Sequence, residues 1–93
     1  MHTNVQIAIA TNNFEMARQA IAKKRKLQEA AALLNRNHIG VHEMYEVENR
    51  LNEIADAHLD IALTALKDPI GYPTTRAKIE NLAKALGLRP FNY

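Results

Sequence analysis

Two histidines and two glutamates lie close together near the middle of the chain, and side chains of these types bind metal ions. His38 and His42 are four residues apart, and Glu43 and Glu46 follow directly. Two imidazoles and a carboxylate can form a metal site when one helix face presents them together. Gly40 separates the histidines, however, and the Glu-x-x-His pairs of di-iron bundles do not occur in the sequence. We therefore predict no metal site and no cofactor.

A further histidine, His58, lies within a row of apolar residues that includes Ile54 and Ile61. A polar residue in such a row usually hydrogen-bonds a neighbour and fixes the register of the helices. We expect this structural role for His58. A pH-sensing or ligand-binding role is the alternative, with Asp56 and Asp60 as its partners.

Four consecutive cations, Lys23 to Lys26, could bind phosphate groups. Four successive helical residues cover about 300° of the helix circumference, so they cannot all face one ligand. We expect Lys24 to lean toward a neighbouring helix and the others to form a solvated face. The alternative is a site for a phosphate-bearing ligand, a nucleotide or a nucleic acid, although a net charge of +2 is small for such a binder. Its candidate residues are Arg18, Lys23, Arg25, Lys26, Arg76 and Lys78, with the backbone amides near Thr75.

The composition argues against an enzyme and against a membrane protein. Cysteine and serine are both absent, which removes the two commonest nucleophiles, and no glycine-rich phosphate loop occurs. The N-terminus does not resemble a signal peptide, and every apolar run is shorter than the roughly 20 residues of a membrane span. We predict a non-catalytic cytoplasmic protein with no membrane contact.

Capping signals divide the chain into four expected helices, at approximately residues 4–10, 13–36, 41–67 and 75–86. Thr3 with Gln6 has the form of a capping box, and Asn12 with Glu15 resembles a second helix start. Gly87 is suited to end the last helix in a left-handed conformation. Val5, Ile7 and Ile9 also alternate as in a strand, so a strand at residues 4–10 is the alternative.

The helix at 41–67 carries two apolar stripes, which indicates two packing neighbours. The chain is therefore predicted to be one all-α domain, residues 1–93. We expect an antiparallel two-helix hairpin on which a short N-terminal and a short C-terminal helix pack, forming a small helical bundle. Segment charges of +4 for 1–37, −5 for 38–68 and +3 for 69–93 favour side-by-side packing. The first stripe is Met44, Val47, Leu51, Ile54, His58, Ile61 and Ala65, and the second is Ala55, Leu59, Ala62, Leu63 and Leu66.

The segment Lys78–Leu88 reads KIENLAKALGL and is similar to the first helix and turn of a helix-turn-helix unit. A recognition helix should follow, yet the remaining residues after Leu88 are too few to form one. We therefore interpret the segment as an amphipathic helix with a glycine stop.

Apolar residues at the hairpin end exceed what one neighbouring helix can cover, since Ala30 to Leu34 are apolar around the whole helix. Uncovered apolar surface indicates a protein contact, most often between identical chains. We predict a small interaction protein, such as an adaptor, inhibitor or regulatory subunit, that forms a homo-oligomer, typically a dimer, and binds another protein. The expected interface residues are Ala30, Leu33, Leu34, Met44, Tyr45, Val47, Tyr72, Phe91 and Tyr93.

Overall fold

Helices account for all regular structure in the described part of the chain. The structure is a computed structural model that describes residues 1–33 and 40–93. Within these residues it contains α1 (Asn4–Leu33), α2 (Val41–Ala65) and α3 (Thr75–Leu86), and no strand. The all-α prediction is confirmed.

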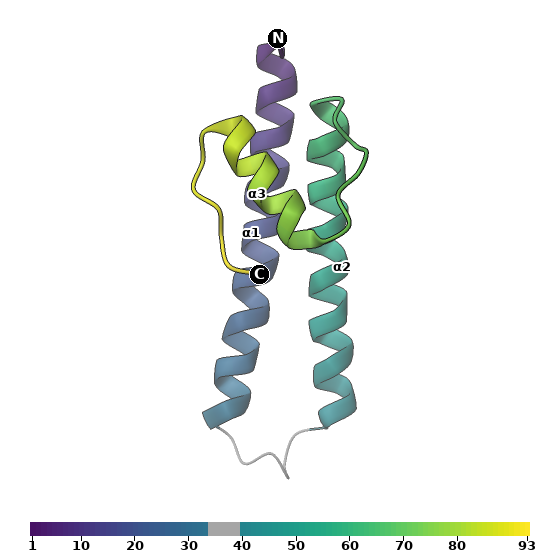
Figure 1. Cartoon of the computed structure of the whole chain (residues 1–93). Coiled ribbons are helices and arrows are strands. Elements are labelled where there is room, and N and C mark those ends of the chain that lie inside the picture. The colour runs from purple at the N-terminus through teal and green to yellow at the C-terminus, as the bar shows by residue number, and fades with distance from the viewer. Residues whose placement is uncertain (34–39) are drawn as a thin grey trace.

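The two long helices lie side by side in opposite directions, and α3 crosses one face of the pair (Figure 1). α3 covers the half that contains the start of α1 and the end of α2, and the C-terminal tail returns along α1. The molecule is therefore an elongated rod, with extents of 53, 21 and 18 Å along its principal axes. In the other half of the rod, the described residues form only the two long helices.

α1 begins as predicted but continues where a break was expected. The Thr3 amide donates to Gln6 Oε1 at 2.8 Å and the Gln6 amide donates to Thr3 Oγ1 at 3.1 Å, which forms the capping box. The strand alternative at residues 4–10 is wrong, and so is the helix start at Asn12. Asn13 lies within the helix, and its side-chain amide donates to the Ile9 carbonyl at 2.8 Å. The predicted end of this helix at residue 36 lies outside the described residues.

The ends of the other helices follow local signals. α2 stops two residues before its predicted end, because Lys67 adopts a left-handed φ of 56° and the Asp68 amide turns back to Leu63. α3 has the predicted bounds. The Thr74 hydroxyl accepts from the Ala77 amide at 3.1 Å, and Gly87 ends the helix with φ 67°. Only glycine adopts that conformation without strain.

The hydrophobic core lies where all three helices meet. Many of its residues are alanines, which let the helix backbones approach closely, and the large side chains fill the remaining space. Tyr72, Leu86, Leu88 and Phe91 pack against the edge of this core. The buried residues are Ala10, Phe14, Ala17, Ala20 and Ile21 of α1, Ala55, Leu59, Ala62, Leu63 and Leu66 of the α2 region, and Ile79, Leu82 and Ala83 of α3.

Truncating Leu82 should test how strongly α3 is anchored. Leu82 is fully buried, so Leu82→Ala should lower the free energy of unfolding by about 2–5 kcal/mol. Urea denaturation followed by circular dichroism measures this loss. The exposed Lys84→Ala on the same helix is the control, with an expected change within about 0.5 kcal/mol. Equal losses in the two variants would contradict the observed packing of α3.

Candidate interaction surface

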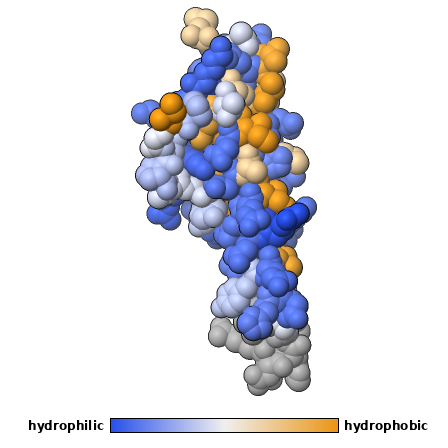
Figure 2. Space-filling view, turned by 90° about the vertical axis from the view of Figure 1, so that its right-hand side faces the viewer, coloured by the Kyte–Doolittle hydropathy of each residue, from blue (hydrophilic) through white to orange (hydrophobic). Residues whose placement is uncertain are grey.

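Large apolar side chains remain exposed on the side of the α1–α2 pair that faces away from α3. In Figure 2 the α3 side of the molecule is on the left, and hydrophobic side chains form a band along the opposite, right-hand edge. We call this surface the open face. Its exposed apolar residues are Val5 (67%), Ile9 (42%) and Met16 (43%) on α1, and Val47 (47%), Ile54 (39%) and Ile61 (47%) on α2.

Heptad spacing places these residues in two parallel rows. Ile9 and Met16 are seven residues apart, as are the successive members of the row Val47, Ile54 and Ile61. Seven residues make nearly two helical turns, so each row runs almost straight along its helix. Leu27 on α1 and Leu51 on α2 continue the pattern and are half-buried between the helices. A spacing of three and four residues of this kind is typical of helices that pack against other helices.

The first apolar stripe predicted for α2 is therefore not the buried one. The second stripe forms the core with α1 and α3, whereas Val47, Ile54 and Ile61 of the first stripe face outward. The matching row on α1 was missed. Its signal is the spacing of Ile9, Met16, Ala20 and Leu27, which the expected break at Asn12 had interrupted.

A polar pair joins the two helices within the open face. His58 Nδ1 and Asn13 Oδ1 are 2.8 Å apart. Asn13 donates its amide group to the Ile9 carbonyl, so its oxygen accepts from His58 and the proton is assigned to Nδ1. His58 thus bonds a neighbour, as predicted, but its partner is Asn13 on the other helix.

Asp56 and Asp60, the alternative partners of His58, bond α3 instead. Lys78 Nζ lies 3.3 Å from Asp56 Oδ1 and 2.8 Å from Asp60 Oδ1, and the Thr75 hydroxyl donates to Asp56 at 2.9 Å. Burial by itself lowers the pKa of Lys78, but the hydrogen bonds to Asp60 and Asp56 outweigh it, and the net pKa is raised. These contacts join the start of α3 to α2, and the Lys78 ammonium group is engaged within the chain.

α3 does not cover the predicted interface at the hairpin end. Leu33 is 88% exposed and Tyr45 59% exposed, Ala30 is also exposed and Met44 is half-buried. Leu34 lies outside the described residues. Because α3 ends far from this part of the rod, apolar side chains remain in contact with solvent, as expected (Figure 1).

The three aromatic residues assigned to the same interface, Tyr72, Phe91 and Tyr93, each make a contact within the chain. Phe91 packs against Phe14 with ring centroids 5.1 Å apart. The Tyr72 hydroxyl donates to Asp68 Oδ2 at 2.7 Å, and this bond raises the pKa of Tyr72. Tyr93 lies under the ammonium group of Lys24, 4.4 Å from the ring centroid.

The consecutive cations divide as the helix geometry requires. Lys24 leans toward α2, where its ammonium group donates to Asn52 Oδ1 at 2.9 Å, and burial lowers its pKa. The charge of Arg25 adds to this lowering and Glu48 opposes it. Lys23, Arg25 and Lys26 are exposed. This arrangement confirms the expected placement of Lys24.

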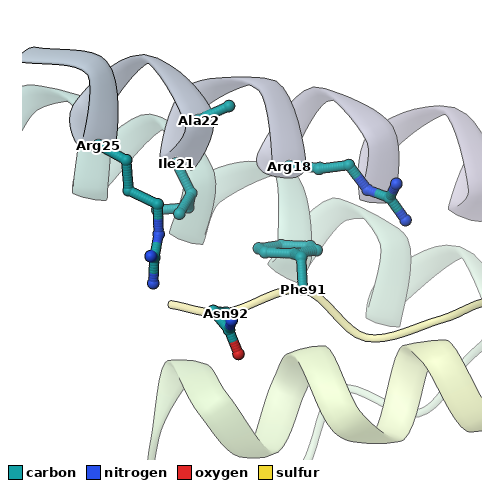
Figure 3. A pocket seen from close by; sticks show the side chains of 6 residues that line it. All are labelled: Arg18, Ile21, Ala22, Arg25, Phe91 and Asn92. Carbon is teal, nitrogen blue, oxygen red and sulfur yellow. The ribbon is translucent and has the colours of Figure 1, made fainter.

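Two residues of the predicted phosphate set line one open pocket of about 200 Å³. Arg18 and Arg25 contribute to it with Ile21, Ala22, Phe91 and Asn92 (Figure 3). Their guanidinium groups point in different directions, and the Phe91 ring lies between them. Arg18 is also engaged, because Nη2 donates to the Arg89 carbonyl at 3.3 Å and Nε lies 3.4 Å from Glu15 Oε1, outside hydrogen-bond geometry. Lys23, Lys26, Arg76 and Lys78 do not line the pocket.

The metal candidates are not brought together within the described residues. His42, Glu43 and Glu46 are exposed, and His38 lies outside the described residues. In the part of the chain that the structure describes, no group of three or more His, Asp or Glu side chains is placed to hold a metal ion. No described helix has the length and apolar character needed to cross a membrane.

Comparisons with protein-family models, with curated proteins and with solved structures find no match for this chain.

Neutralising Lys78 should weaken the attachment of α3. We expect Lys78→Gln to lower the free energy of unfolding by about 1 kcal/mol at neutral pH, because its carboxylate partners are partly exposed. Since the pKa of Lys78 is raised in the fold, the stabilisation is present below its ordinary value of 10.5 and is lost as the pH rises through the raised pKa. Urea titrations of both proteins across this range measure the difference. Lys84→Gln on the same helix is the control, and an equal effect of the two variants would contradict this role.

Proposed function

We propose that this chain is a small non-catalytic interaction protein that acts through self-association and protein contact on the open face. The observation that carries the proposal is the double row of exposed apolar residues on α1 and α2. The six residues are each 39–67% exposed, and an exposed cluster of large apolar side chains of this kind marks a protein contact. Burial of this surface is the strongest driving force available to the molecule.

The titratable groups that lie close together support a non-catalytic role. Lys78, Asp56 and Asp60 form a cluster, but each carboxylate neutralises the same ammonium group and holds two helices together. His58 bonds Asn13 in the same structural manner. The chain contains neither cysteine nor serine as a nucleophile. These side chains have partners that explain their positions without a reaction.

Charged substitutions on the open face should abolish association. We expect the unmodified protein to self-associate at micromolar concentration and the double variant Ile54→Glu/Ile61→Glu to be monomeric. The dissociation constant should rise at least about a hundredfold, because burying an unpaired carboxylate costs several kcal/mol. Light scattering coupled to size exclusion measures the mass, and circular dichroism checks that the helices persist.

Ile70→Glu is the matched control, since Ile70 is 84% exposed and lies in the turn between α2 and α3, outside the open face. This variant should associate as the unmodified protein does. An unmodified protein that stays monomeric at high micromolar concentration would contradict self-association. A double variant that associates normally would assign the contact to another surface.

Binding of a phosphate-bearing ligand is a second candidate, and the pocket between Arg18 and Arg25 is the observation that favours it. We expect ATP, used as the probe, to bind in low salt and to lose affinity severalfold between about 50 and 200 mM salt. Arg25→Gln should weaken binding about tenfold, and Lys23→Gln/Lys26→Gln, outside the pocket, should not. Isothermal titration calorimetry measures this. Absence of binding at millimolar ATP would exclude this candidate.

A further inference from the structure

We propose that a second copy of this chain covers the open face, with the two-fold axis parallel to the helices and each α1 lying against the partner's α2. This inference rests on the proposed self-association and specifies its geometry. The result is a four-helix bundle in which every helix is antiparallel to its neighbours. α3 of each copy remains on the outside, because it occupies the opposite face of its own pair.

The pattern of the open face identifies the occupant as a pair of helices. Apolar residues that recur every seven residues along both edges, with others three or four residues away, form knobs that pack against other helices. A surface two helices wide is completed by two further helices, and an identical open face supplies them. A specific interface buries about 1,200–2,000 Å² in total, so the contact must include the flanking residues as well as the six exposed apolar residues of each copy.

Charge decides between the two symmetric ways of placing the second copy. An axis perpendicular to the helices would put α1 against α1 and α2 against α2, which pairs like charges. An axis parallel to the helices puts α1, whose segment carries +4, against α2, whose segment carries −5. The rotation of about 100° per residue places Lys26 and Glu46 on the outer flanks of the open face. The rise of about 1.5 Å per residue places them at about the same level along the rod. In the second arrangement, each Lys26 therefore faces the partner's Glu46.

The Asn13–His58 pair defines how the two copies align along the helix axes. A two-fold axis parallel to the helices keeps each residue at the same level along that axis. Residues at one level, which form a layer of the bundle, therefore face the same residues of the other copy. The two polar pairs then meet in one layer, with apolar layers formed by Ile9 and Ile61 on one side and Met16 and Ile54 on the other. A single polar layer in an apolar interface fixes the register of a bundle.

Cysteine crosslinking tests the geometry, because the chain contains no cysteine of its own. Ile9→Cys and Ile61→Cys are prepared as separate proteins, mixed and mildly oxidised. We expect a disulfide-linked heterodimer on a non-reducing gel, because α1 lies against the partner's α2. Met16→Cys mixed with Ile54→Cys should behave in the same way on the other side of the polar layer. Ile9→Cys alone should crosslink at least about tenfold less, since the two α1 helices are diagonal and about 14 Å apart.

Each outcome separates this inference from the proposed function. Efficient links between identical variants, such as Ile54→Cys with itself, would establish the perpendicular axis and overturn the proposal. A dimer by light scattering that gives none of these links would overturn the geometry and leave self-association in place. A monomer would overturn both.

Charge reversal provides a second measurement that needs no crosslink. Lys26→Glu alone should weaken association severalfold, and so should Glu46→Lys alone. Mixing the two variants should restore it, because the reversed charges face each other in the heterodimer. Failure of the mixture to associate better than either variant alone would overturn the opposition of α1 and α2.

Discussion

α2 carries apolar side chains on two of its sides, and the arrangement of the other helices follows from how those sides are covered. α1 packs along α2 between these two sides. α3 covers one of the two sides with Ile79 and Leu82. Since α3 has 12 residues, it spans about 18 Å and can seal only part of a rod that is 53 Å long. The three helices therefore complete one core within the chain, and the apolar side chains of the open face remain exposed.

Polar contacts orient this packing more than they drive it. Lys78 and Thr75 attach the first turn of α3 to Asp56, and Thr74 caps the same turn. Each exposed ion pair contributes about 1 kcal/mol or less, whereas each buried leucine contributes about 1.5–3 kcal/mol. Burial therefore holds α3 on the pair, and the ion pairs determine where along α2 it begins. Phe91 then closes the edge of the core by packing on Phe14.

Features that depend on a few neighbouring residues could be predicted from the sequence. The capping box at Thr3, the bounds of α3 and the left-handed Gly87 are local, and each was found where expected. Asn12 and Asn13 misled the prediction because an asparagine can cap a helix or, as Asn13 does here, bond the preceding turn. The local pattern does not distinguish these two uses.

Features that depend on packing between distant segments could not be predicted in the same way. Both stripes of α2 have helical periodicity, and only the position of α3 determines which one is buried. The partners of Lys78 and His58 lie on other helices, and their choice depends on how those helices align. The exposed row on α1 becomes visible only when residues 4–33 are treated as one uninterrupted helix.

The uneven coverage of the rod has a consequence for its fluctuations. Where α3 and the tail are present, opening the helices would disrupt contacts among all three of them. Near Leu33 and Tyr45, separation of the two helices would disrupt only the contacts between α1 and α2. Backbone amides should therefore exchange with solvent along a gradient, fastest at the bare end and slowest beside Phe14 and Leu59. Local opening should therefore be easier in the half that α3 leaves uncovered than in the half that it covers.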